Sequence, residues 1–161
     1  MSIFEGDLNA EGLRIAIAVS HFAEKDGQTK VIDKLLDNTI LVLLKAGLKE
    51  ESLDIFWAPG AFEIPFVAAE IARWREHHAI IALGCVIRGD TIHFDIIAHE
   101  SARALSEVAR EYSIPVINGI LTVENIEQAL ERAERKKLNK GKQFAEAAVE
   151  MGRLMLRIKN S

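Results

Sequence analysis

Residues 83–95 read LGCVIRGDTIHFD, a stretch in which an apolar run stops at a short polar turn that carries one histidine. Residues 79–83 have the length and β-branched content of a buried parallel strand, and residues 94–112 have helical spacing. In an open α/β sheet, ligands bind at the carboxyl ends of the strands, and a helix N-terminus offers unpaired N–H groups to an anion. The turn Gly89-Asp90-Thr91 is therefore a predicted phosphate cradle, and His93 lies next to it.

The same alternation of strand and helix extends along the chain. Helical periodicity follows each of four apolar runs, which predict strands at residues 14–20, 53–58, 79–87 and 115–121. Such alternation predicts an α/β fold with a central four-stranded parallel sheet and helices on both faces. We expect one domain over residues 1–161, with residues 1–12 as an N-terminal arm.

Several residues mark the expected ends and faces of the helices. Gly47 can end the first helix in a left-handed cap, and Pro65 is tolerated in the first turn of the second. Thr122 is a candidate N-cap for the fourth helix. The third helix carries small residues, such as Ala102 and Ala109, beside larger apolar ones, so two of its faces are expected to be packed.

The composition excludes several classes of protein. The chain has 161 residues, 49% of them hydrophobic, and a net charge of −4. It therefore lacks the excess of basic residues that is typical of nucleic-acid binding. The basic cluster of Arg135, Lys136, Lys137 and Lys140 is interpreted as a solvated helix end. No apolar run reaches the ~20 residues of a membrane span, and the N-terminus lacks the pattern of a signal peptide. We therefore expect a cytoplasmic protein with neither a membrane nor a nucleic-acid partner.

His93 is the histidine at the strand-to-helix turn, and an ordinary imidazole pKa of ~6.5 suits proton transfer at neutral pH. A merely solvated first-turn histidine is the alternative. His77 and His78 lie in a polar link and are expected at the surface. The histidine spacing gives no helix face of metal ligands, and no dinucleotide or Walker motif is present, so we expect no metal and no cofactor.

Three further positions allow two interpretations each. Cys85 acts as a nucleophile only beside a base, and within an apolar run it is more typical of inert core. Residues 59–65, PGAFEIP, fix a strand-to-helix corner that displays Phe62, which by composition alone is more typical of a core. Phe22, after the first strand, has the same two interpretations. Asn139-Lys140-Gly141 opens the last helix, either as a plain loop or as a cation aimed at a ligand phosphate.

Together, four segments resemble the lumazine synthase family. They occur in order and cover essentially the whole chain: WAPGAFEIP at 57–65, the turn at 84–95, GILTVENIEQA at 119–129 with Arg132, and NKG at 139–141. The resemblance implies a flavodoxin-like three-layer α/β/α sandwich.

The resemblance also implies the penultimate step of riboflavin biosynthesis. In that step, 5-amino-6-ribitylamino-pyrimidinedione condenses with 3,4-dihydroxy-2-butanone 4-phosphate to give 6,7-dimethyl-8-ribityllumazine, phosphate and water, without a metal or organic cofactor. It further implies a homopentamer with active sites between adjacent subunits, and riboflavin synthase as a further partner.

Roles for individual residues follow from the resemblance by position. The residues implied to contact the pyrimidine substrate are Phe22, stacked on its ring, Ala61, Phe62 and Glu63 along its ribityl chain, Cys85, Val86 and Ile87 at the ring edge, and Asn118. Asp90 and Thr91 would give backbone N–H groups to the phosphate, with Arg132 of an adjacent subunit as its charged partner. His93 would carry protons, and Lys140 would be an additional nearby cation.

This sequence departs from the family pattern in two loops. His21-Phe22-Ala23 replaces the usual Arg-Phe-Asn, so the amide is lost while the ring remains. Residues 134–139, ERKKLN, replace Gly-Thr-Lys-x-Gly-Asn, so both glycines are gone and three like charges lie together. We expect assembly to stop at the pentamer, or at most to pair two pentamers weakly.

Two classes of function remain from the sequence. The first is the synthase, and the second is a non-catalytic flavin- or lumazine-binding paralogue or a structural shell protein. The presence of His93, Arg132, Lys140 and the phosphate turn favours the enzyme.

Overall fold

A central parallel sheet organises the computed structural model, which describes residues 1–21 and 28–161. The sheet has the order β2-β1-β3-β4, and all of its strands run parallel. The elements in chain order are β1 (Ile15–Ser20), α1 (Gln28–Lys45), the short 3-10 helix η1 (Glu50–Ser52), β2 (Leu53–Ala58), α2 (Ile64–Trp74), β3 (Ala79–Ile87), α3 (His93–Tyr112), β4 (Val116–Val123), α4 (Ile126–Ala133) and α5 (Lys140–Lys159).

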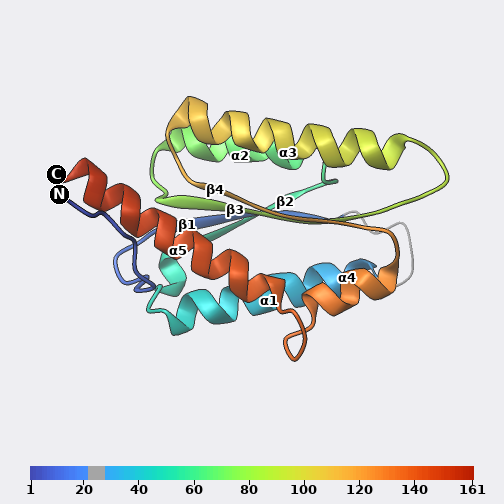
Figure 1. Ribbon diagram of the computed structural model, residues 1–161, viewed down its shortest axis with the longest axis horizontal. Coiled ribbons are helices and arrows are strands. Elements are labelled where there is room, and N and C mark those ends of the chain that lie inside the picture. Colours follow the sequence, from blue (N-terminus) through green and yellow to red (C-terminus); the bar gives the residue numbers. More distant parts are fainter. Residues whose placement is uncertain (22–27) are drawn as a thin grey trace.

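Helices cover both faces of the sheet (Figure 1). One layer consists of α2 and α3, and the other consists of α1, α4 and α5. The predicted three-layer α/β/α architecture with four parallel strands is therefore confirmed. Within the described part of the chain, no helix is long and apolar enough to cross a membrane.

The two central strands are buried on both faces, and their alternating side chains divide between two cores. In β1, Ile15, Ile17 and Val19 face the core shared with α1 and α5, whereas Ala16 and Ala18 face the core shared with α2. Each fully buried Leu or Ile contributes about 1.5–3 kcal/mol relative to exposure. The continuous apolar runs in the sequence are therefore explained by burial on two sides.

The helix ends confirm two predictions and correct one. Gly47 adopts a φ of +99°, and the N–H of Leu48 reaches back to the carbonyl of Leu43 at 3.1 Å, which closes the predicted left-handed cap. Pro65 lies in the first turn of α2, as predicted. The prediction for Thr122 is wrong, because β4 continues through this residue to Val123. Asn125 caps α4 instead, and its side chain accepts the N–H of Gln128 at 2.9 Å.

The prediction that His77 and His78 lie at the surface is also wrong. His77 is 7% exposed, and His78 is half-buried with its Nδ1 accepting the N–H of Arg14 at 2.8 Å. His77 Nε2 lies 2.8 Å from Asp54 Oδ2, which also accepts from Arg14. Although burial acts to raise it, hydrogen bonds from His77 and Arg14 lower the pKa of Asp54. The two histidines are covered because Asp54 in β2 and Arg14, just before β1, supply these partners.

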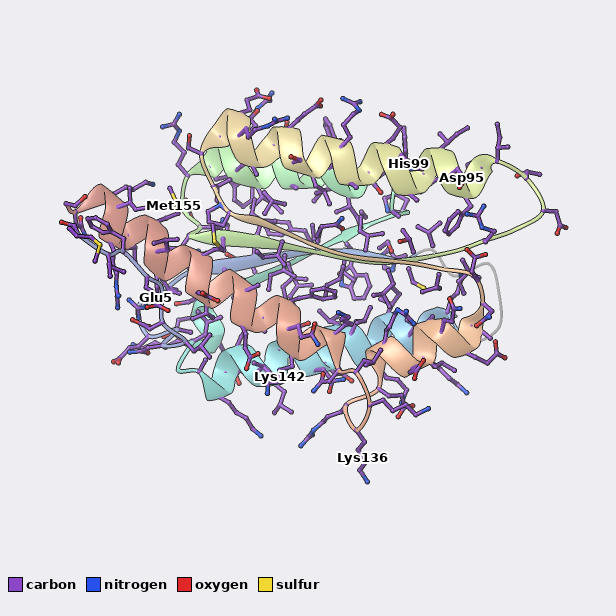
Figure 2. The ribbon with its side chains drawn as sticks, viewed as in Figure 1. Glu5, Asp95, His99, Lys136, Lys142 and Met155 are labelled. Carbon is purple, nitrogen blue, oxygen red and sulfur yellow. The ribbon has the colours of Figure 1, made fainter. Side chains whose placement is uncertain are left out.

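Residues before β1 lie along the last helix. Arg157 donates to the carbonyl of Glu5 and to Asp7, and Arg153 donates to the carbonyl of Asn9. Figure 2 shows Glu5 beside α5. These contacts tie the start of the chain to its last helix, on the α1, α4 and α5 side of the sheet.

The start of α5 packs closely on α1 at Gly141, and this contact yields a prediction for stability. A Cβ at Gly141 would lie 2.7 Å from the carbonyl oxygen of Leu35. Overpacking costs about 1–3 kcal/mol, whereas helix propensity favours alanine over glycine by roughly 0.5–1 kcal/mol. Gly141→Ala is therefore expected to lower the free energy of unfolding by about 1–2 kcal/mol in chemical denaturation at matched protein concentration.

Gly89→Ala is the matched control, because a Cβ there meets nothing within 4 Å. It should change the free energy of unfolding by no more than about 0.5 kcal/mol. If Gly141→Ala proved as stable as the original chain, the close packing of α5 on α1 would be contradicted.

Candidate active site

A cavity of about 770 Å³ opens at the carboxyl ends of β1, β2 and β3. This volume falls within the roughly 300–1,000 Å³ of small-molecule sites. Its walls come from Ser20 at the end of β1, residues 59–63 after β2, residues 85–87 at the end of β3, and the turn and first helical turns that follow. Parallel pairing places these ends at one edge of the sheet, so segments far apart in sequence meet there.

Most of the predicted substrate contacts meet in this cavity. Those that line it are Ala61, Phe62, Glu63, Cys85, Val86, Ile87, Thr91 and His93. Asp90 is exposed on the same turn, next to Thr91. Phe22 lies outside the described residues.

The corner between β2 and α2 presents its side chains to the cavity mouth. Pro65 occupies the first turn of α2, and the N–H of Glu63 reaches the carbonyl of Gly60 at 3.2 Å. This tight turn leaves Phe62 53% exposed. The composition-based interpretation of Phe62 as a core residue is therefore wrong, because the corner turns it away from both cores.

Cys85 lies on the cavity floor and is 8% exposed. Burial raises the pKa of its thiol to about 12. A thiol with such a pKa is almost entirely protonated at neutral pH and is a poor nucleophile. The structure therefore favours the interpretation of Cys85 as an inert apolar wall.

His93 is the first residue of α3, and its imidazole is exposed at the cavity. Its N–H approaches the hydroxyl oxygen of Thr91 at 3.3 Å. The first turn of a helix carries N–H groups with no partner inside the helix, and the dipole there favours negative charge. The turn before His93 is therefore suited to a phosphate, with an imidazole in reach of the same cavity.

Three predicted residues lie away from this cavity. Asn118 is exposed on the edge strand β4, where its Oδ1 accepts the N–H of Ile120 at 3.1 Å. Arg132 donates to the carbonyl of Gln128 at 3.1 Å in α4, and Lys140 Nζ donates to Gln143 Oε1 at 2.8 Å in α5. A single chain therefore does not bring these residues to the cavity.

Sequence reasoning missed several residues of the cavity wall. Among them are Ser20, Gln28, Ile96 and Ile97. The position of Ser20 as the last residue of a predicted strand was a usable signal, since strand ends carry ligand contacts. The isoleucines had no such signal, because their helical spacing is equally typical of packing.

Within residues 1–21 and 28–161, no group of three or more His, Cys, Asp or Glu side chains is placed to hold a metal ion.

Comparison with known proteins identifies the family. The sequence model described as 6,7-dimethyl-8-ribityllumazine synthase matches residues 12–156. Two proteins from Clostridium kluyveri strains, each named 6,7-dimethyl-8-ribityllumazine synthase, are each 45% identical over 155 residues, which cover 96% of this chain and 97% of the relative. The chain belongs to the 6,7-dimethyl-8-ribityllumazine synthase family.

Membership of the lumazine synthase family confirms the resemblance seen in the sequence. The chain is a transferase of riboflavin biosynthesis, and the alternative of a non-catalytic paralogue finds no support in these comparisons.

The raised pKa of Cys85 gives a direct chemical prediction. Because the thiol is buried and protonated, iodoacetamide at pH 8 should alkylate the folded protein far more slowly than the denatured chain. Mass spectrometry reads the result without ambiguity, since the chain has a single cysteine. Equal rates in guanidinium chloride and in native buffer would contradict the assignment of Cys85 as an inert wall.

Proposed function

We propose that this cavity condenses 5-amino-6-ribitylamino-pyrimidinedione with 3,4-dihydroxy-2-butanone 4-phosphate, and that it releases 6,7-dimethyl-8-ribityllumazine, phosphate and water. The observation that carries the proposal is that the predicted pyrimidine contacts, the predicted phosphate turn and His93 meet in one cavity. The proposed location is the cytoplasm, where a single unpaired cysteine is typical.

Orientation is the main source of rate in this proposal. The substrate amine attacks the ketone of the butanone, which is feasible chemistry once the two groups face each other. Well-oriented reactants gain roughly 7–11 kcal/mol over the bimolecular reaction. The apolar walls at Val86 and Ile87 hold the ring, and the exposed N–H groups of the turn hold the phosphate at the other end.

His93 moves protons in the steps that follow attack. Imine formation releases one water, and phosphate then leaves. In ring closure the ribitylamino nitrogen attacks the remaining carbonyl and loses a proton, and a second water is released. An imidazole can both accept and return protons, and a positioned general acid–base contributes about 10²–10⁴-fold.

A second copy of the chain completes the proposed site. Among the described residues that line the cavity there is no lysine or arginine, although the substrate phosphate is an anion. Arg132 and Lys140 lie outside it in the same chain. We therefore assign the phosphate cations to Arg132 and Lys140 of an adjacent subunit, and the edge contact with the pyrimidine to its Asn118.

Exposed apolar side chains beside the cavity support this arrangement. Ile55 and Trp57 on the edge strand β2 are 39% and 44% exposed, and Phe66 on α2 is 71% exposed. An unpaired edge strand flanked by large exposed apolar groups is typical of an interface. We propose a homopentamer, with the small residues of α3 packed around its axis.

The activity test uses the two substrates named above, with the lumazine product followed by absorbance or fluorescence. The purified protein should form product, and a chelator should leave the rate unchanged. His93→Ala should lower kcat by about 10²-fold or more and leave a residual rate from orientation. Absence of product above the uncatalysed rate would refute the proposed reaction.

Arg132→Ala separates substrate binding from proton transfer. Loss of a charge-assisted hydrogen bond should lower kcat/KM for the phosphorylated substrate by the equivalent of about 1.5–3 kcal/mol. The KM of the pyrimidine should change little. Arg135→Ala is the control, because this exposed arginine lies three residues after Arg132 and outside the proposed site. An equal loss of kcat/KM for both substrates in Arg132→Ala would contradict the assigned role.

The link between α4 and α5 predicts the size of the assembly. Glu134 is tied to Lys34 at 2.9 Å, and Arg135, Lys136 and Lys137 are exposed, with Lys136 projecting from the tip of the link (Figure 2). Like charges at this tip should oppose contact between pentamers. Sedimentation should give a particle of about 90 kDa, five times the 17.9 kDa subunit, and a closed shell of about sixty subunits would overturn the argument.

A further inference from the structure

Arg88 connects three elements beside the cavity, since it lies between the lining residues Ile87 and Gly89. Its backbone N–H donates to the carbonyl of Val123 at 2.9 Å, so the residue is fixed to β4 just beyond the end of β3. Its Nη1 and Nη2 donate to the two carboxylate oxygens of Asp95, each at 3.0 Å, and its Nε lies 3.0 Å from Oε2 of Glu124. Asp95 lies in the first turn of α3 (Figure 2).

A third contact of its side chain completes what we call the Arg88 clamp, the side chains of Arg88, Phe94, Asp95 and Glu124. The guanidinium carbon lies 4.2 Å from the centre of the Phe94 ring, a cation–π contact with a buried aromatic side chain. The planar guanidinium thus binds a carboxylate through a fork of two N–H groups and stacks on a ring, which lysine cannot reproduce.

The clamp encloses the anion-binding turn. Residues 89–93 lie between Arg88 and the pair Phe94 and Asp95, and all five are exposed. A Cβ on Gly89 would meet nothing within 4 Å, so the turn lies away from the packed core. Neighbouring side chains therefore do little to fix its path, whereas the clamp fixes both of its ends.

We propose that Arg88 is a positioning residue, which holds the phosphate-binding turn and His93 in their reactive places through Asp95, Glu124 and Phe94. This inference rests on the proposed function of the cavity and adds to it a residue that acts through others. His93 immediately precedes two of the side chains that Arg88 grips, so its place at the start of α3 depends on the clamp.

The charges of the clamp argue against Arg88 as a direct phosphate ligand. One guanidinium faces the carboxylates of Asp95 and Glu124, so the group carries a net negative charge. The hydrogen bond from Arg88 lowers the pKa of Asp95, which keeps this carboxylate ionised at neutral pH. An anion is therefore not attracted by the clamp itself, and binds instead to the backbone N–H groups that the clamp orders.

The clamp is also a poor candidate for a purely stabilising feature. The side chains of Arg88, Asp95 and Glu124 are 38%, 42% and 59% exposed, and ion pairs at such exposure contribute little to global stability. A positioning role therefore predicts a large effect on substrate use with a small effect on unfolding.

The experiment compares Arg88→Lys, Asp95→Asn and Glu124→Gln with an Arg103→Lys control. Arg103 also pairs with two carboxylates, Glu100 and Glu107, but on the exposed surface of α3 away from the cavity. For Arg88→Lys and Asp95→Asn, we expect KM for the phosphorylated substrate to rise by about 10- to 100-fold, the cost of a small displacement of a binding group. Glu124→Gln leaves the fork intact and should give a smaller rise.

Two readouts separate positioning from other roles. The KM of the pyrimidine and the melting temperature should match those of Arg103→Lys. A kcat that falls with the fraction of folded protein, while both KM values stay unchanged, would overturn the proposal in favour of a structural role. An Asp95→Asn variant that uses the phosphorylated substrate as well as the original chain, or better, would overturn it in favour of a direct phosphate ligand.

Calorimetry with inorganic phosphate tests the clamp apart from turnover. Phosphate should bind the Arg88→Lys and Asp95→Asn variants about 10- to 100-fold more weakly than the original chain and Arg103→Lys. Equal phosphate affinity in all four proteins would overturn the inference. If the original chain binds phosphate but forms no lumazine, the proposed function fails while the binding comparison still decides the role of Arg88.

Discussion

Parallel pairing of four strands is the constraint on which the rest of this structure depends. Parallel neighbours require a crossover between each pair, so helices cover both faces of the sheet and the central strands become fully buried. The same pairing gathers the carboxyl ends of β1, β2 and β3 at one edge. The cavity lies at that edge because the connecting turns there are free of the packing that fills the two cores.

Much of this fold could be predicted from local patterns, because each pattern has a single physical cause. Two-sided burial makes β1 and β3 continuously apolar. The positive φ at the end of α1 favours glycine, which is the residue at position 47. Errors arose where tertiary partners decide the outcome. His77 is buried because its ring bonds to Asp54, His78 because its ring accepts the N–H of Arg14, and β4 extends past Thr122 because Ile87 pairs with Val123. Neither partner is visible along the sequence.

The same distinction between local sequence patterns and tertiary partners applies to the candidate site. The turn and His93 could be predicted from the strand-to-helix pattern, because topology places them at a strand end, whereas the contacts at residues 61–63 and 85–87 were predicted from the family resemblance. The clamp could not be predicted, since Arg88 contacts Asp95 seven residues away and Glu124 thirty-six residues away. Residue spacing does not show that one guanidinium binds both carboxylates. Arg132 and Lys140 were predicted from the family resemblance, and the structure explains why one chain does not use them at its own cavity: they belong to α4 and α5, and neither residue lines that cavity. The account therefore divides the proposed site between two copies of the chain.

Complementation between two impaired variants tests that division most directly. His93→Ala and Arg132→Ala are each expected to have low activity, and the two chains are co-expressed in equal amounts and purified as mixed assemblies. If each site takes His93 from one subunit and Arg132 from its neighbour, random association restores both residues in about a quarter of the sites, and lumazine formation recovers to roughly that fraction. Activity that stays at the mean of the two separate variants would contradict a site shared between subunits.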